Sequence, residues 1–399
     1  MLIGFVGKPS AGKSTLFKAA TLADAAIANY PFTTIKPNHG VGFVRIKCAD
    51  KDFNKQCHPR MGYCIKGTRY VPVDLIDVAG LVPGAHLGHG RGNQFLDDLR
   101  QADVLIHVID ASGSINEKGE PVEIGSYDPC KDVEFLEVEL DMWYFGIIHK
   151  GWEKFARTVI QEKSEIHIAL AKQLSGLKVS EDMLKNAIEE LKLDKDKPHL
   201  WTEFALQQLA TILRKKTKPI IIAANKIDIP IAQENLLRLR TQFPERTFVG
   251  CSGDCELALR EAAKAGLIEY APGDKDFTIL TQEKLSPKQQ QALLFIRDNI
   301  LAKLGSSGVQ EVLDKAVFEL LKYIAIFPGG VNKLEDSNGH TLPDCFLMPP
   351  RSTALDFAYK LHTDFGKNFI RAIDVRTKRA VGKEYVLKQA DVMEIVAGK

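Results

Sequence analysis

The spacing of apolar residues along this 399-residue chain predicts strands that are buried on both faces, with helices between them. Short and almost uninterrupted apolar runs occur at residues 2–6, 71–76, 104–110, 219–224 and 247–249. Runs of this length and composition are typical of strands in the interior of a sheet. We therefore expect an α/β core built on these strands.

The long connection between two of these runs predicts an inserted helical region. Residues 111–218 are too many for a single crossover connection. Apolar residues recur there every three or four positions, which is typical of amphipathic helices that pack along one face. We expect four helices, with packed residues Val133, Leu136, Leu140, Trp143 and Ile147 in the first, Phe155, Val159, Ile166, Leu170 and Leu174 in the second, Met183, Ala187, Ile188 and Leu191 in the third, and Phe204, Leu209, Ile212 and Leu213 in the fourth.

The last part of the chain changes from helical to strand-like patterns. Helices are expected at residues 289–303 and 310–326, with a Gly-Ser-Ser-Gly break between them. After the second helix, short alternating runs are separated by Gly, Pro and Asn turn signals. One short helix is expected at 354–361, followed by closing strands at 385–387 and 392–396. This alternation predicts a small β-grasp module.

Composition limits the class of protein further. The net charge of +2 gives no overall signature of polyanion binding, and no apolar stretch is long enough to cross a membrane. The first residues already form a predicted strand, so we expect no signal peptide. The seven cysteines are irregularly placed, which favours a reducing compartment. We therefore expect a cytoplasmic protein with no membrane and no DNA partner.

Two groups of cysteines are candidate sites. Cys57-His58 and Cys64 resemble half of a zinc site, but no second pair at a suitable spacing follows them, so we expect no metal there. Cys251 and Cys255 are expected to be packed thiols rather than a redox pair.

A phosphate-binding loop is predicted directly after the first strand. Residues 7–14 have the sequence GKPSAGKS, and a helix-like segment follows them. In this context, backbone N–H groups and a helix N-terminus form an anion site, with the lysine on the terminal phosphates and the serine hydroxyl on Mg²⁺. We assign nucleotide binding here to Gly7, Lys8, Pro9, Ser10, Ala11, Gly12, Lys13, Ser14 and Thr15.

The segment Asn225-Lys226-Ile227-Asp228 predicts that the base is guanine. An ionised Asp only accepts hydrogen bonds, so Asp228 can accept from N1–H and the exocyclic amine of guanine, whereas adenine offers no matching donors. The Lys226 stem can cover the base, and Asn225 can tie this loop to the phosphate loop. Further along, Ser252 and Gly253 can offer N–H groups to the guanine O6. The predicted ligand is therefore GTP or GDP.

Two further segments are expected to respond to the γ-phosphate. Asp77 and Gly80 form a D-x-x-G motif, with Asp77 holding Mg²⁺ through water and the Gly80 N–H contacting the γ-phosphate. In the segment 29–38, Thr34 is expected to close over the γ-phosphate and Mg²⁺. The predicted magnesium ligands are thus Ser14, Thr34 and Asp77.

The group that positions the attacking water is not obvious from the sequence. The residue after Gly80 is Leu81, where Ras-like switches carry a glutamine, and an apolar side chain cannot orient water. The candidates are His86, His89 and Arg91 in the same glycine-rich segment, a backbone group, or a partner. A solvated loop explains His86 and Arg91 at least as well. We expect slow hydrolysis that a partner stimulates, with the catalytic set Lys13, Thr34, Gly80, His86 and Arg91.

Three longer segments resemble a known family. YPFTTIKPN at residues 30–38, DVAGLVPGAHLGHGRGNQFL at 77–96 and LPDCFLMPPRSTALDFAYKLH at 342–362 are similar to the Obg superfamily of translation GTPases, in particular the archaeal form of its YchF branch. Three departures matter: many YchF proteins have an altered base motif and favour ATP, Asn is frequent where this chain has Ser10, and Leu is usual at Arg91.

The resemblance implies a three-part organisation. We expect a P-loop NTPase G domain of α/β class at residues 1–125 and 216–320, a helical insertion at 126–215, and a C-terminal β-grasp domain of TGS type at 321–399.

The partner is expected to be a ribosome or RNA, bound through the TGS-like domain and the helical arm. Residues 367–388 carry seven basic residues and two acidic ones, which suits an RNA backbone. A solvated sheet edge explains the same charges. Besides a GTPase switch, two functions stay open: an RNA- or ribosome-binding assembly protein with a structural nucleotide, for which Leu81 argues, and an ATPase, against which Asp228 argues.

Overall fold

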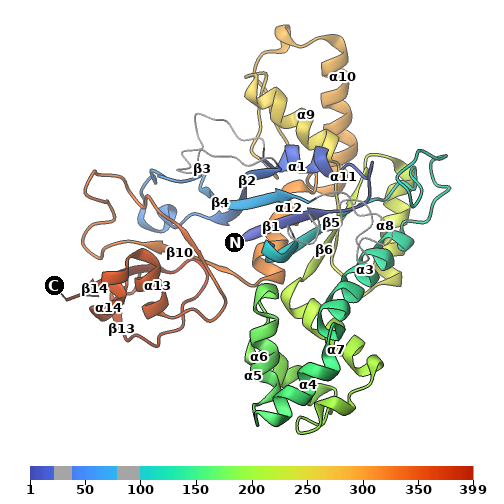
Figure 1. Cartoon of the computed structure of the whole chain (residues 1–399). Coiled ribbons are helices and arrows are strands. Elements are labelled where there is room, and N and C mark those ends of the chain that lie inside the picture. Colours follow the sequence, from blue (N-terminus) through green and yellow to red (C-terminus); the bar gives the residue numbers. More distant parts are fainter. Residues whose placement is uncertain (22–37, 79–98, 399) are drawn as a thin grey trace. The chain divides into compact units, whose positions relative to one another are not determined.

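The computed structural model describes residues 1–21, 38–78 and 99–398 (Figure 1). The chain forms two compact units: Met1–Phe17 with Leu75–Gly253, and Lys18–Asp74 with Asp254–Lys399. Strand β4 (Thr68–Asp77) is divided between the units: its residues up to Asp74 belong to the second unit, and its residues from Leu75 belong to the first.

The first unit contains a parallel sheet with buried strands. Its order is β1 (Leu2–Val6), β5 (Val104–Asp110), β6 (Ile220–Asn225) and β7 (Phe248–Gly250), with the last residues of β4 beside β1. The predicted apolar runs are therefore confirmed as strands. The carboxyl ends of parallel strands lie at one edge of a sheet, so the polar residues that follow them are brought together there.

Helices surround this sheet and form the inserted arm. Helix α1 (Lys13–Thr21) follows β1, and α8 (Pro230–Gln242) connects β6 to β7. The arm consists of α3 (Cys130–His149), α4 (Trp152–Gln161), α5 (Ile166–Gln173), α6 (Glu181–Glu190) and α7 (Glu203–Thr217), with 3₁₀ turns at Ser175–Leu177 and Pro198–Leu200. Its apolar faces form one buried cluster that continues to Val6 and Ile76 of the sheet.

Two details of the arm differ from the sequence prediction. The expected second helix is divided into α4 and α5, because Lys163 adopts a left-handed φ of 52° and its N–H bonds back to the Ile160 carbonyl, which ends α4. Phe204 is 66% exposed and does not pack. It lies five residues from Leu209, which turns it about 140° around α7, away from the buried stripe.

The second unit contains the other end of β4, paired with β2 (His39–Lys47) and β3 (Tyr63–Ile65), and a 3₁₀ turn at Ala49–Phe53. Its helices are α9 (Gly253–Lys264), α10 (Pro287–Phe295), α11 (Ala302–Leu304) and α12 (Val309–Lys315), with π-helical turns at Ile296–Leu301 and Ala316–Leu320, a 3₁₀ turn at Gln282–Lys284, and a small hairpin of β8 (Ile268–Glu269) and β9 (Thr278–Ile279). The helix expected at 289–303 is confirmed: α10, the π-helical turn Ile296–Leu301 and α11 follow one another without a break.

The C-terminal module of this unit is a mixed sheet with two helices. The strand order is β11 (Phe346–Met348), β10 (Ile324–Pro328), β14 (Val392–Ala397), β12 (Phe369–Asp374) and β13 (Arg379–Val381), and the helices are α13 (Ala354–Leu361) and α14 (Thr363–Lys367). The predicted helix at 354–361 and closing strand at 392–396 are confirmed.

Two predictions for this region were wrong. The helix expected at 310–326 ends earlier, because Ile324–Ile326 pair with β11 as a strand. Residues 385–387 form no named strand and contribute one isolated bridge, between Val386 and Thr353. Both segments are apolar and short, so tertiary pairing rather than local pattern decides their structure.

Candidate nucleotide-binding site

The loop between β1 and α1 has the backbone of a phosphate-binding turn. Ser10 and Gly12 adopt left-handed φ values of 63° and 86°, and the Leu16 N–H donates to the Gly12 carbonyl at 2.9 Å as α1 begins. The positive end of α1 and its first N–H groups therefore lie at this loop, which suits an anion. The other loop residues assigned from sequence, Gly7, Pro9, Ala11 and Thr15, lie on the same turn or in the first turn of α1.

Lys13, Ser14 and Asp77 meet beside this loop. The Lys13 ammonium pairs with Asp77 Oδ1, and the Ser14 hydroxyl donates to Asp77 Oδ2 at 3.1 Å. A hydroxyl and a carboxylate are the oxygen donors that Mg²⁺ prefers, so this pair fits the predicted cation. The other predicted residues of the reaction, Thr34, Gly80, Leu81, His86 and Arg91, lie outside the described residues and stay predictions.

A single buried amide joins the phosphate loop to the two loops that were predicted to hold the base. Asn225 Nδ2 donates to the Ala11 carbonyl at 3.0 Å, and Asn225 Oδ1 accepts from the Gly253 N–H at 3.0 Å. The space between them is tight, because a Cβ on Gly12 would lie 2.1 Å from Asn225 Nδ2. Position 12 therefore requires glycine both for its left-handed φ and for this close approach.

Lys226 is fixed by a buried carboxylate that sequence reasoning missed. Its ammonium lies 3.0 Å from Asp110 Oδ2 and donates to the Ser114 hydroxyl at 3.0 Å. Burial raises the pKa of Asp110, but hydrogen bonds from Ser112 and Ser114 and the Lys226 charge outweigh this, so the pKa lies below its ordinary value. The sequence signal for this contact is an Asp at the end of an apolar strand, followed by Ala-Ser-Gly-Ser at residues 111–114.

Asp228 is oriented by a neighbouring loop. The buried Ser252 hydroxyl donates to Asp228 Oδ1 at 2.7 Å. Backbone hydrogen bonds from Ile227 to Cys251 and from Cys251 to Ala224 hold the two loops together. A carboxylate has more acceptor sites than one serine uses, so Asp228 keeps the capacity to accept hydrogen bonds from a ligand.

The Lys8 side chain has a different place from the rest of the loop. It is 6% exposed, pairs with Asp132 at 2.8 Å and lies over the Tyr127 ring, 3.9 Å from its centroid. Burial raises the pKa of Asp132, and the hydrogen bond and charge of Lys8 oppose that rise. Lys8 therefore contributes only its backbone to the phosphate loop, and its side chain connects that loop to the start of α3.

Family models match three parts of the chain. A model described as 50S ribosome-binding GTPase matches residues 2–133, one described as Obg-like GTPase YGR210-like, G4 motif-containing domain matches 223–330, and one described as TGS domain matches 338–397. A GTP-binding protein of Methanocaldococcus jannaschii is 48% identical over 99% of both chains. The chain belongs to the Obg-like, YchF-related family of GTP-binding proteins.

Other relatives and solved structures agree with this Obg-like assignment. A GTP-binding protein of Schizosaccharomyces pombe is 37% identical over 89% of this chain and 88% of its own, and the protein named ribosome-binding ATPase YchF of Bacillus subtilis is 27% identical over 98% and 97%. The crystal structure of a GTP binding protein from Pyrococcus horikoshii matches with a TM-score of 0.80 and 38% identity over the whole of both chains.

The expected fold class is therefore confirmed: a P-loop G domain of α/β class, a helical region and a C-terminal TGS domain. The S. pombe YchF GTPase shares this fold, with a TM-score of 0.60 at 19% identity over 99% of this chain and 97% of that one. Among the residues that the structure describes, no helix is both long and apolar enough to cross a membrane.

Replacing Gly12 with Ala should weaken nucleotide binding by about 10-fold or more, since displacing the Asn225 amide leaves buried partners unsatisfied at about 1–3 kcal/mol each. Titration with a fluorescent GDP analogue measures this. Gly146→Ala is the matched control, because Gly146 lies on α3 with nothing within 4 Å of an added Cβ. Equal affinities in the parent and Gly12→Ala proteins would contradict the tight contact.

Proposed function

We propose that this Obg-like protein is a Mg²⁺-dependent GTPase that hydrolyses GTP to GDP and phosphate, as a slow molecular switch associated with ribosomes or RNA. The arrangement around Asn225 carries the proposal, because its amide bonds both the Ala11 carbonyl and the Gly253 N–H. This contact would couple phosphate recognition to base recognition through one side chain. A binding site with this coupling can respond to the whole nucleotide rather than to either end alone.

The orientation of Asp228 favours guanine over adenine. Its carboxylate is half-buried and accepts a hydrogen bond from Ser252. Bound adenine would desolvate this carboxylate further and would offer it no donor from the base. Sites built around a specific hydrogen bond reject an analogue that lacks it by large factors. The bacterial relatives named ATPases keep an ATPase function as the rival proposal.

Nucleotide titration calorimetry tests the base assignment. GTP should bind at least about 100-fold more tightly than ATP, and Asp228→Asn should weaken GTP binding while admitting xanthosine nucleotide, whose base can pair with the amide. Asp182→Asn, an equal charge change on an exposed position of the arm, is the control and should leave both affinities unchanged. Equal affinities of the parent protein for GTP and ATP would refute guanine selection.

The phosphate end of the site supports hydrolysis. Ser14 and Asp77 would hold Mg²⁺, which when bound would neutralise charge on the β- and γ-phosphates. Lys13 adds a positive charge at the start of α1, where the N–H groups of the helix also face an anion. The predicted Thr34, Gly80, His86 and Arg91 would complete the reaction site. Because Leu81 cannot orient water, we expect the intrinsic rate to be low.

Single-turnover GTP hydrolysis separates chemistry from product release. Chelating Mg²⁺, or changing Lys13 to Ala, should abolish turnover through lost charge neutralisation. Leu81→Ala should leave the basal rate within a small factor, and it serves as the control for His86→Ala and Arg91→Ala, which should be slower if either side chain positions the water. A severe loss confined to the Leu81 variant would contradict this assignment, and a rate that is insensitive to chelation would contradict the magnesium requirement.

The TGS domain offers a surface that suits RNA. Lys367, Arg371, Lys378 and Arg379 are exposed and form no ion pair with any residue that the structure describes. Arg376 differs, because it pairs with Asp52 at 2.7 Å and donates to the Ala390 carbonyl.

Exposed apolar side chains lie close to these charged residues in the sequence. Ile370 on β12 is 60% exposed, and Phe365 on α14 is 44% exposed with its ring 6.0 Å from that of His362. Interspersed cations and exposed rings are the two components of single-strand RNA binding. A ribosomal or RNA partner also supports a cytoplasmic location.

Salt dependence tests the RNA surface. Replacing Lys367, Arg371, Lys378 and Arg379 with Ala should weaken ribosome or RNA binding and flatten its dependence on salt, because fewer counterions are released. GTP affinity should be unchanged. The control removes the same charge from exposed arm positions, Lys154, Lys163, Lys185 and Lys195, and should have a smaller effect, because the arm also carries many acidic residues. Parent-like affinity and salt slope in the TGS variant would assign these charges to a solvated edge.

The same assay separates a switch from an assembly protein. A switch should bind ribosomes differently with GDP and with a non-hydrolysable GTP analogue, since the γ-phosphate orders the switch segments. Equal binding in both states would favour the assembly function.

A further inference from the structure

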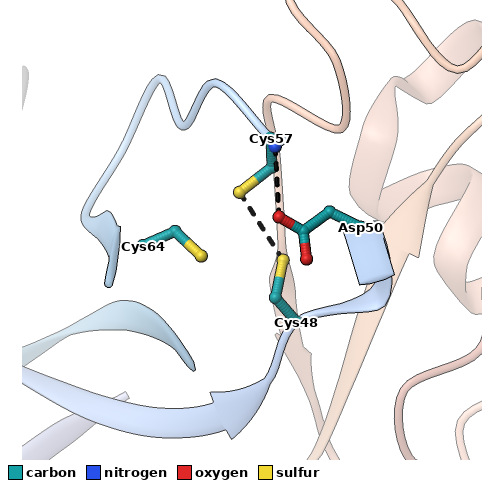
Figure 2. A group of neighbouring side chains, drawn as sticks. All are labelled: Cys48, Asp50, Cys57 and Cys64. Carbon is teal, nitrogen blue, oxygen red and sulfur yellow. Dashed lines mark hydrogen bonds between the residues drawn. The ribbon is translucent and has the colours of Figure 1, made fainter. Parts of the chain in front are cut away.

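Three cysteines and an aspartate meet at the end of β2, outside the nucleotide site. Cys48 directly follows β2, Asp50 lies in the 3₁₀ turn Ala49–Phe53, Cys57 lies in the loop that follows, and Cys64 lies on β3 (Figure 2). One sulfur or carboxylate oxygen from each of these four residues lies within 4.8 Å of the others. Figure 2 shows the sulfurs of Cys48 and Cys57 and the carboxylate of Asp50 facing one another.

The cluster is buried and contains an unsatisfied oxygen. Cys48, Asp50 and Cys57 are 1%, 0% and 4% exposed. Asp50 Oδ2 accepts from the Cys57 N–H at 3.1 Å, but Oδ1 is buried and has no hydrogen-bond partner among the described residues. A buried carboxylate oxygen without a partner is costly, and a cation beside the three sulfurs would satisfy it.

We propose that Cys48, Cys57, Cys64 and Asp50 bind a structural zinc ion. Zinc accepts thiolate and carboxylate ligands in tetrahedral sites, and a Zn–S bond of about 2.3 Å places two sulfurs about 3.8 Å apart. The Cys48 and Cys57 sulfurs lie 3.6 Å apart, close to that separation. Three thiolates select against Mg²⁺ and Ca²⁺, which prefer oxygen ligands. With four protein ligands the site is closed, which is typical of structural rather than catalytic zinc.

The surroundings fit a negatively charged metal centre. Three thiolates, a carboxylate and Zn²⁺ carry a net charge of about −2, by the ligand charges of such sites. Arg69 is the residue opposite Cys64 in the pairing of β3 with β4, and it is 1% exposed, so a buried positive charge lies on the strand beside the cluster.

The zinc would stabilise the loop between Cys57 and Cys64, which is hydrogen-bonded to part of the C-terminal module. Within the second unit, the His58 N–H donates to the Thr341 carbonyl at 2.8 Å, and the Arg60 N–H donates to the Pro343 carbonyl at 3.0 Å. The Arg60 side chain pairs with Asp344. Cys57 and Cys64 flank this stretch, so a metal between them fixes the backbone that makes these bonds. The sequence pattern predicts no metal here because it brings together only Cys57 and Cys64. The structure adds Cys48 as a third thiol.

Metal analysis of the full-length chain, purified without a histidine tag or chelator, tests the site. We expect about one zinc ion per chain by inductively coupled plasma mass spectrometry. Cys57→Ser should reduce zinc affinity by about 100-fold or more, and Asp50→Asn, which keeps an oxygen acceptor for the Cys57 N–H, by about 10–100-fold. Cys130→Ser is the matched control, because Cys130 is also buried and hydrogen-bonded, to Gln242 at 3.0 Å.

Cobalt gives a readout that does not depend on whether a variant folds. Adding Co²⁺ to the metal-depleted parent chain should produce the sulfur-to-cobalt charge-transfer band and the visible bands of a tetrahedral thiolate site. The proposal would be overturned if the purified parent chain contained zinc only at background level and gave no such cobalt band. It would also be overturned if Cys130→Ser lost as much zinc as Cys57→Ser. Thiol titration of the denatured chain should find all seven cysteines reduced. Two missing thiols would overturn it in favour of a disulfide.

Discussion

The amide of Asn225 is the constraint on which the nucleotide site depends. It donates to the phosphate loop through the Ala11 carbonyl and accepts from the Gly253 N–H, so loops from three strand ends share one buried group. Because both partners are backbone atoms, the amide fixes main-chain positions rather than side-chain rotamers. Gly12 gives it room. The spacing between the phosphate loop and the loops proposed to hold the base therefore follows from a single side chain with a hydrogen bond to each side.

Much of this site could be predicted because it follows strand ends. Lys13, Ser14, Asn225 and Asp228 come shortly after apolar runs, and parallel strands bring their carboxyl ends to one edge whatever lies between them in sequence. The tie from Asn225 to the phosphate loop, which the sequence predicts, is present. The short helix Ala354–Leu361 was also predicted, and the structure shows why a local pattern suffices: Thr353 and Asp356 form a capping box within four residues.

What could not be predicted depends on contacts between distant segments. The carboxylate that holds Lys226 is Asp110, which lies 116 positions earlier. Cys48 joins Cys57 and Cys64 only because a 3₁₀ turn and a hairpin fold back, and no spacing rule anticipates that. The strand at Ile324–Pro328 has the apolar pattern of a helix end, and only its pairing with β11 decides between them. In each case the structure of a residue depends on a partner that is distant in the sequence, and local pattern does not identify that partner.

The buried pair of Lys8 and Asp132 has a consequence for how the arm can be exchanged. Lys8 belongs to the phosphate loop and Asp132 to the first turn of the inserted arm, so neither charge can be lost alone without leaving the other buried. The arm and position 8 are therefore physically coupled, because each buried charge needs the other. An arm transplanted onto another phosphate loop would keep its first turn paired only where that loop supplies a positive charge at the matching position.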